Sequence, residues 1–256
     1  MVRRYVVAFD ESHPAQLAWE WARTRADVKG VQCVAVHIVG DDRGTSDMPQ
    51  GRGSADAPVH LAGDVPETLA AFAGPDDMLV IGTGKTGFAH GRVFGFTGVR
   101  IVALAPCPVV VIPSVDLRFR SGVVLGLDGP ETAAESAAMA ATEAARRGEA
   151  IQVISSGRHA HRDGDDDDAV KIAERVIHEG WPQLTVRTRS RSADTAAVLL
   201  DAAQAASLLV IDPGLAPADR WSGDRGDIAL EVLFNANAPI LVARSHARER
   251  HPSSIG

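Results

Sequence analysis

The chain has few of the residues that build disulfide-rich, aromatic-rich or membrane proteins. Its 256 residues include two cysteines and one tyrosine, and aromatic residues make up 5%. Cys33 and Cys107 fall in segments expected to be buried strands, which favours small core residues over a disulfide or a redox pair. No apolar run approaches the ~20 residues that a membrane span needs, and the first strand is too short for a secretory signal. These absences predict a cytoplasmic protein without membrane partners.

Positive charge is also scarce, with a formal net charge of -7. A surface that follows nucleic-acid phosphates needs clustered Lys and Arg, so the composition argues against a nucleic-acid partner. The basic segment 187–191 alternates with small residues, as expected of a strand. The apolar fraction of 45% and the charged fraction of 23% are typical of a globular protein.

Patterns that carry catalysis or bind metals are missing as well. No G-x-S-x-G nucleophile turn occurs, and Gly84-Lys-Thr fails as a P-loop because Leu79 stands where its first glycine belongs. The histidines of the first part lack ligand spacing, and the pair His159 and His161 reads best as a solvated loop. The aspartate run 165–168 fits a helix N-terminus better than a calcium loop. The sequence therefore predicts neither an enzyme nor a metal site.

What the chain does have is one α/β pattern written twice. Tyr5-Val-Val-Ala-Phe-Asp10 matches Val123-Val-Leu-Gly-Leu-Asp128, and each half ends in an apolar strand led by proline, Pro108 or Pro239. We therefore expect a first half at 1–116, a second half at 120–246 and a polar tail at 247–256. The second half gains an amphipathic helix at 165–178. The first half lacks a helix there and has the Gly/Ser/Asp-rich loop 41–58 in its place.

Hydrophobic periodicity predicts strands and helices in alternation. The first half should form strands 4–9, 32–39, 59–61, 78–81 and 108–112, with helices 14–28 (capped by Ser12), 66–73 and 94–105. The second half should form strands 122–127, 150–155, 184–189, 208–211 and 239–243, with helices 131–147, 165–178, 194–205 and 226–236. This order predicts two tandem α/β domains with Rossmann-like, doubly wound parallel sheets, whose ligands bind at the carboxyl ends of the strands.

A glycine-rich loop follows the fourth strand of the first half only. Gly82-Thr-Gly-Lys-Thr-Gly87 stands where the second half has Asp212-Pro-Gly-Leu-Ala-Pro217. Glycines let backbone N–H groups turn toward phosphate oxygens, whereas prolines donate no N–H and acids repel phosphate. A turn that only packs the loop on the sheet is the alternative. The contrast predicts a nucleotide site in the first half and none in the second.

These features resemble the universal stress protein family in its tandem, two-domain bacterial form. The family's ATP-binding members carry Gly-x2-Gly-x9-Gly-(Ser/Thr) after strand four, and Ala105-Pro-Cys-Pro-Val-Val-Val-Ile-Pro113 resembles the way its domains end. Gly82 and Gly95 match the first and last glycines, whereas Lys85 and Phe96 depart from the motif.

The resemblance implies that Asp10 meets the adenosine end of a nucleotide and that Ile38 lines the adenine. A turn or helix-cap role is the alternative for Asp10, with Glu11 and Ser12 competing for the cap. Lys85 would direct a charge toward the phosphates. The expected nucleotide-binding residues are Ala8, Phe9, Asp10, Ile38, Gly82, Gly84, Lys85, Gly87, Gly95, Phe96 and Thr97.

Two functions stay open at this point. The first is a stress-response regulator that binds ATP, or a related adenine nucleotide with Mg²⁺, in its first half without significant turnover. The second is a nucleotide-free module for dimerisation or for docking an unknown protein partner. The resemblance implies that the last strands of the two halves pair within the chain as a pseudo-dimer, and pairing of two chains as a homodimer is left open.

Overall fold

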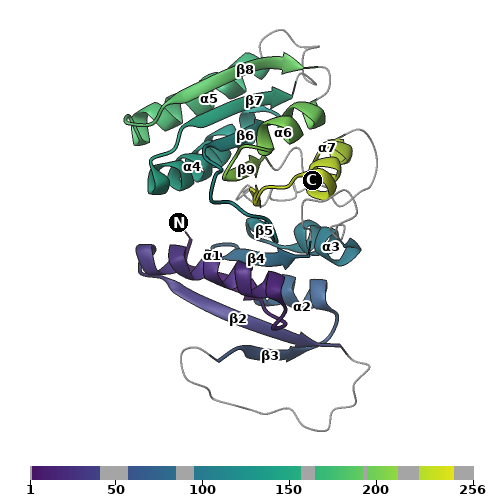
Figure 1. Cartoon of the computed structure of the whole chain (residues 1–256). Helices are drawn as coiled ribbons and strands as arrows, with labels where there is room; N and C mark the ends of the chain where they lie inside the picture. The colour runs from purple at the N-terminus through teal and green to yellow at the C-terminus, as the bar shows by residue number, and fades with distance from the viewer. Residues whose placement is uncertain are drawn as a thin grey trace, which may run out of the picture.

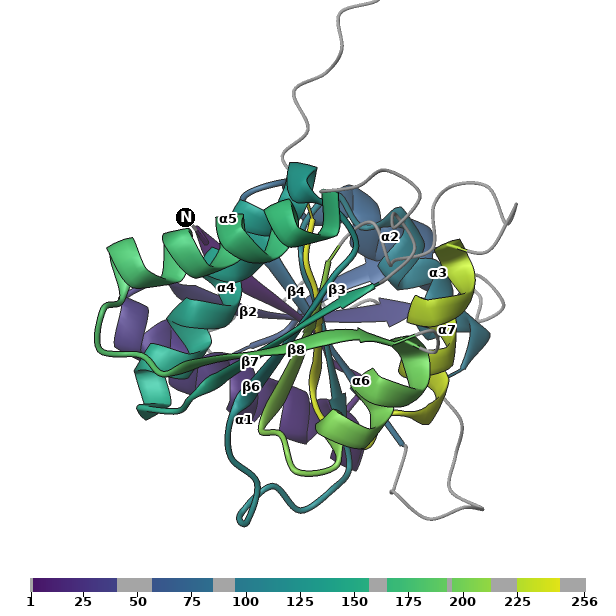
Figure 2. The same cartoon turned by 90° about the horizontal axis from the view of Figure 1, so that it is seen from above.

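The computed structural model describes residues 2–40, 57–84, 95–156, 165–192, 195–212 and 225–244. One ten-stranded sheet runs through both halves in the order β3-β2-β1-β4-β5-β10-β9-β6-β7-β8. The halves are stacked end to end, with β3 at one edge of the sheet and β8 at the other (Figure 1). Seen from above, the strands fan around one axis, as the twist of a large sheet requires (Figure 2).

The first half follows the predicted alternation closely. Its elements are β1 (Arg4–Ala8), α1 (His13–Lys29), β2 (Gln32–Val39), β3 (Val59–Ala62), α2 (Val65–Phe72), β4 (Met78–Thr83), α3 (Phe96–Leu104) and β5 (Val109–Pro113). Ser12 caps α1 as expected: its side chain accepts a hydrogen bond of 3.4 Å from the N–H of Ala15. The loop predicted at 41–58, which stands in place of a helix, lies almost wholly outside the described residues.

The second half repeats this order with one more helix. Its elements are β6 (Val123–Leu127), α4 (Pro130–Arg147), β7 (Ile151–Ser156), α5 (Asp165–Gly180), β8 (Val186–Ser192), α6 (Thr195–Ala203), β9 (Leu208–Ile211), α7 (Arg225–Asn235) and β10 (Ile240–Val242). The helix predicted from the insertion is α5. The strand expected at 184–189 begins two residues later, because Leu184 belongs to the turn that follows α5.

The halves join through their last strands. Val111 pairs with Ile240 and Val109 with Val242 in an antiparallel ladder between β5 and β10, whereas the other neighbouring strands are parallel. The predicted pairing within the chain is therefore confirmed. The ladder makes the two halves one continuous sheet, and it covers two strand edges that would otherwise be exposed.

Two hydrophobic cores lie on opposite faces of this sheet, and each spans both halves. Helices α1, α4 and α5 cover one face, and α2, α3, α6 and α7 cover the other (Figure 1). Successive residues of β5 alternate between them: Val109 and Val111 face the second group, and Val110 and Ile112 face the first. The central strands β5, β6, β9 and β10 are fully buried and almost wholly apolar because both faces are covered, whereas the edge strand β8 carries Arg187 and Arg189.

Some sequence-based expectations need correction. Cys107 is fully buried but precedes β5 instead of lying in a strand, and Cys33 in β2 is only half-buried. Both are free thiols. No helix among the described residues has the length and apolar character to cross a membrane.

Candidate functional site

A cavity of about 410 Å³ opens at the carboxyl ends of the first-half strands. Its residues come from β1, β2 and β4, from the first two turns of α1, α2 and α3, and from the adjoining loops, so six elements converge on it. Apolar side chains form its interior, and the polar groups are few. The lining residues are Ala8, Phe9, Asp10, Ser12, Ala15, Val36, Ile38, Val65, Leu69, Ile81, Gly82, Thr83, Gly84, Gly95, Thr97, Gly98 and Ile101.

Asp10 is held at the rim by a local turn. Its Oδ1 accepts hydrogen bonds from the backbone N–H of Ser12 at 3.1 Å and from the Ser12 hydroxyl at 2.5 Å. Between them, Glu11 adopts a left-handed backbone with φ 63°. The helix cap is therefore Ser12, and Asp10 positions the cap residue while its carboxylate stays exposed beside the cavity.

Gly82 is needed for packing as well as for the loop. A Cβ at this position would lie 2.1 Å from the carbonyl oxygen of Pro14 and 2.8 Å from the backbone N of Ala15. The start of α1 therefore rests directly on the end of β4. This contact closes one side of the cavity, and only glycine permits it.

Gly95 is the N-cap of α3 and has open space around its Cα, since a Cβ added there would have no heavy atom within 4 Å outside its own chain neighbours. Its carbonyl accepts hydrogen bonds from the N–H groups of Gly98 and Val99 at 3.0 and 3.3 Å. The first turn of α3 thus begins at the cavity, where its dipole favours an anion. Thr97 lines the cavity, whereas the side chain of Phe96 is 66% exposed and the residue is not part of the lining.

Arg100 fixes the wall that α2 and α3 form. It bonds with Asp64 at 3.3 Å and with Glu67, and both acids stand at the start of α2. Its guanidinium is therefore committed to carboxylates. Phe9 borders the cavity while its ring meets Trp19 of α1 edge-on, with 6.2 Å between centroids.

The structure brings together eight of the eleven predicted site residues. Lys85 and Gly87 lie outside the described residues, and Phe96 stands apart from the cavity. Sequence reasoning missed most of the apolar interior. Val36 could have been found, because it lies two positions before Ile38 and shares its face of β2. Leu69 and Ile101 could not, since nothing in the sequence places α2 against α3.

The second half has a different arrangement at the equivalent place. Asp212 follows β9 where Gly82 stands in β4, and it is fully buried. Its carboxylate accepts hydrogen bonds from the Thr132 hydroxyl at 2.6 and 2.7 Å and from the Ser136 hydroxyl at 2.9 Å. In the second half this position is thus a buried acid that is hydrogen-bonded to α4. In the first half it is a glycine, and the backbone of α1 packs directly against it.

Metal ligands do not gather in the described part of the chain: no group of three or more His, Cys, Asp or Glu side chains there could hold an ion. His37 and His60, which are register partners in β2 and β3, lie with their rings 5.3 Å apart.

Comparison with known proteins supports the resemblance drawn from the sequence. No family model matches the chain. Universal stress protein Rv2623 of Mycobacterium tuberculosis is 25% identical over 289 aligned residues, covering 93% of this chain and 95% of that protein. Universal stress protein Rv2005c of the same organism is 26% identical over 285 aligned residues and covers 93% and 96%.

Solved structures share the fold at low identity. The crystal structure of a universal stress protein from Archaeoglobus fulgidus superposes with a TM-score of 0.68 at 15% identity, covering 95% of this chain and 99% of that one. A putative universal stress protein from Pseudomonas aeruginosa gives 0.59 at 15% identity, with 94% and 93% covered. The expected resemblance to tandem universal stress proteins is thus confirmed over nearly the whole chain.

Proposed function

We propose that the first half binds ATP or a related adenine nucleotide in the cavity at the ends of β1 and β4, as a regulator without significant turnover. The observation that carries the proposal is the convergence of Asp10, Ile38, Gly82, Gly95 and Thr97, predicted from the sequence, on one cavity of about 410 Å³. This volume lies within the usual range of small-molecule sites.

The apolar interior supports the binding of a flat base. The interior of the cavity is lined by Val36, Ile38, Leu69 and Ile101, and none of these side chains is charged. Burial of an aromatic ring against such side chains is favourable. Asp10 at the rim offers a carboxylate that would accept hydrogen bonds from ribose hydroxyls.

The phosphate end would lie toward the glycine loop and the start of α3. Backbone N–H groups and a helix N-terminus bind phosphate without a lysine, and Gly82, Gly84 and Gly95 keep side chains away from the path of the backbone. The exposed Phe96, which replaces the hydroxyl residue of the family motif, leaves the cavity open. We further propose that the second half does not bind ATP, because the buried Asp212 would repel phosphate at the matching position.

The test is isothermal titration calorimetry of the full chain with ATP and Mg²⁺, supported by thermal unfolding. We expect one nucleotide to bind per chain. A ligand at 100 times its dissociation constant should raise the free energy of unfolding by about 2.7 kcal/mol, and the melting temperature should rise accordingly. Asp10→Asn should weaken binding about tenfold. Asp27→Asn, which changes another exposed acid at the far end of α1, is the matched control and should leave binding unchanged.

Turnover is tested by chromatography of the nucleotide after incubation with the protein. Unchanged ATP after hours at saturating protein supports a binding role, and steady release of ADP contradicts it. No heat and no melting shift with ATP would overturn nucleotide binding itself.

That last outcome would favour the second function, a nucleotide-free docking module. Phe96 and Leu104, both on α3, are 66% and 44% exposed and would then be the first surface to test. Their substitution by serine should abolish partner binding or dimerisation while leaving the melting temperature within a few degrees.

A further inference from the structure

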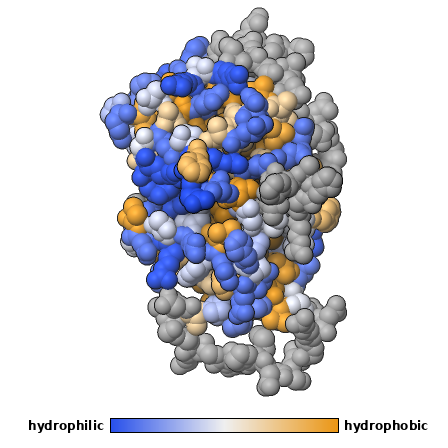
Figure 3. Space-filling view, in the orientation of Figure 1, coloured by the Kyte–Doolittle hydropathy of each residue, from blue (hydrophilic) through white to orange (hydrophobic). Residues whose placement is uncertain are grey.

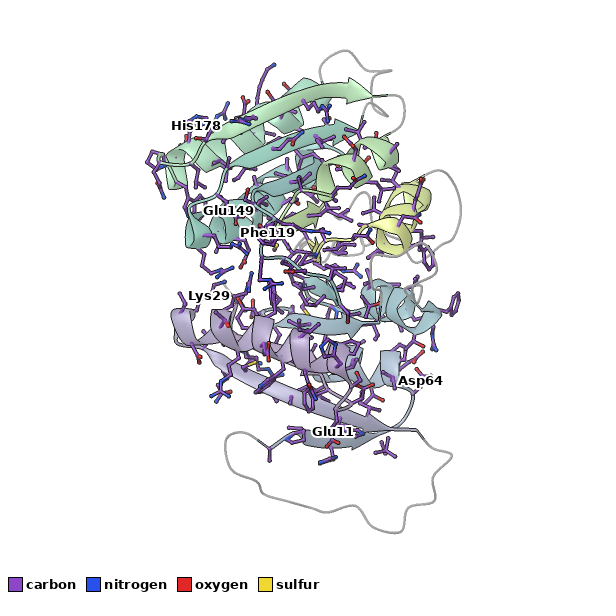
Figure 4. All side chains as sticks on the ribbon, in the orientation of Figure 1. Glu11, Lys29, Asp64, Phe119, Glu149 and His178 are labelled. Carbon is purple, nitrogen blue, oxygen red and sulfur yellow. The ribbon has the colours of Figure 1, made fainter. Side chains whose placement is uncertain are left out.

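A second cavity, of about 460 Å³, lies between the two halves at the opposite ends of the strands. The first half contributes residues that precede β1, β2, β4 and β5, and the second half contributes one side of α4 and the end of β10. Figure 4 labels Glu11, just before α1, and Lys29, the last residue of α1. The cavity proposed to bind a nucleotide adjoins the start of α1, and the second cavity adjoins its end. The two sites are therefore separate.

Most of its wall is hydrophobic. Val2, Val31, Met78 and Pro108 come from the first half, and Ala138, Met139 and Leu241 come from the second. Methionine side chains adapt to different apolar shapes, so this wall suits a hydrocarbon body. Strongly hydrophilic side chains surround the junction of the halves on the face shown in Figure 3.

Two carboxylate oxygens in the wall accept no hydrogen bond from the described residues. One is Oδ1 of Asp77, whose side chain is fully buried, and the other is the buried Oε2 of Glu135. Asp77 uses its other oxygen for Arg4, at 2.9 Å, and for the N–H of Gly74, at 2.8 Å. The Arg3 Nε lies 3.6 Å from Oδ1, beyond hydrogen-bond distance. Buried acceptors of this kind are costly unless a donor reaches them.

Three other charged residues of the cavity already have partners. Glu143 pairs with Arg25 at 2.8 Å and with Arg146 at 3.5 Å. Arg244 donates to the carbonyls of Val102 and Ala103. The Lys29 ammonium lies 5.7 Å from the ring centre of Tyr5, and burial lowers the pKa of Lys29. Asp76 adds one more acid, which leaves four carboxylates and two cations in the lining.

We propose that this interface cavity binds a small hydrophobic amine, with its ammonium donating to Asp77 and Glu135 and its hydrocarbon body against Met78, Met139 and Leu241. An ammonium supplies N–H donors for the two oxygens that accept no hydrogen bond, and its positive charge suits a lining that holds four carboxylates and two cations. Because the wall comes from both halves, the bound amine stabilises their contact.

The experiment uses n-octylammonium as the probe, titrated into the full chain by calorimetry at neutral pH. Octanol and octanoate, which have the same chain length, separate the contribution of the charge. We expect saturable binding of one octylammonium with a dissociation constant of about 0.1 to 1 mM. Octanol should bind at least about tenfold more weakly, and octanoate should not bind detectably. Octanol within twofold of octylammonium, or no saturable binding of the amine up to 5 mM (about five times the weakest expected constant), overturns the proposal.

Two variants locate the site. Glu135→Gln should weaken octylammonium binding about tenfold, whereas Glu131→Gln, an exposed acid one turn earlier on α4, should leave it unchanged. Ala138→Phe fills the cavity with an apolar side chain and should abolish binding without removing a charge. Unchanged binding in both site variants overturns the assignment. Saturating ATP should not alter the octylammonium affinity, so failure of either site is visible independently of the other.

Discussion

Arg25 of the first half donates a hydrogen bond from Nε to Oε2 of Glu143 in the second half, at 2.8 Å. Both side chains are buried, with 8% and 6% of their surface exposed. The guanidinium lies 3.5 Å from the ring centre of Trp21, and burial lowers the pKa of Arg25 to about 10 although the neighbouring Glu143 raises it. This ion pair links α1 to α4 on one face of the sheet, beside the ladder between β5 and β10.

Removal of one partner should destabilise the chain strongly. Arg25→Ala leaves a buried carboxylate without its main donor, and we expect the free energy of unfolding to fall by about 3 to 5 kcal/mol. Urea denaturation measures this change. The double variant Arg25→Leu with Glu143→Leu should recover most of the loss, because no unpaired charge is then buried. A single-variant cost below about 1 kcal/mol would mean that water solvates the pair.

Alanine at Gly82 should be far more costly than alanine at Gly95. The new Cβ would clash with the Pro14 carbonyl at 2.1 Å, whereas Gly95 has free space around it. We expect Gly82→Ala to cost about 3 kcal/mol or more through displacement of α1, and Gly95→Ala to cost about 1 kcal/mol or less as a change of helix cap. Thermal unfolding of the two variants decides this, and equal costs would contradict the packing role of Gly82.

Asp212 should stabilise the second half through its two hydroxyl donors. Asp212→Ala leaves the hydroxyls of Thr132 and Ser136 without this acceptor, so we expect a loss of about 2 to 3 kcal/mol in urea denaturation. Asp201→Ala is the control, because Asp201 is exposed on α6 and its ion pair with Arg189 is long, at 3.8 Å. That control should change stability by about 0.5 kcal/mol or less. A similar cost for both variants would exclude a structural role for the buried carboxylate.

Cys107 should make stability depend on pH in the alkaline range. Burial, helped by the Asp77 charge, raises the pKa of this thiol from 9.0 to about 11. Above pH 9 the unfolded chain loses the proton while the folded chain keeps it, so the free energy of unfolding falls as pH rises from about 9 to 11.

The check compares wild type with Cys107→Ala at pH 7 and pH 10. Cys107→Ala leaves the same cavity at pH 7 and at pH 10. A change with pH in the stability difference between the two proteins therefore measures the ionisation of the thiol. We expect the stability gap between the two proteins to narrow by about 1 kcal/mol at pH 10. A gap that does not change with pH would show that the thiol ionises equally in both states. Cys33, whose pKa burial raises to about 12, is present in both proteins.

The sequence by itself determined the order of elements, the repeat and the pairing of the two halves. Apolar strands and amphipathic helices are local patterns, so β1, α1 and β4 were found within one or two residues. The repeat of Pro108 and Pro239 before the last strands, together with the family resemblance, predicted the β5–β10 ladder. Asp10 and Gly82 were placed together because parallel strands end at one edge of a sheet.

Only the tertiary structure decided how side chains far apart in the chain meet. Arg25 and Glu143 are separated by 118 positions, and no local pattern makes one the partner of the other. The sequence indicates only that Gly82 is a loop glycine, and the structure shows that the backbone of Pro14 packs against it. The interface cavity depends on how α1 and α4 are placed next to each other on one face of the shared sheet. Such contacts arise from the packing of one element against another. Short-range sequence patterns indicate which face of a helix or strand is buried, but not which residues it will contact.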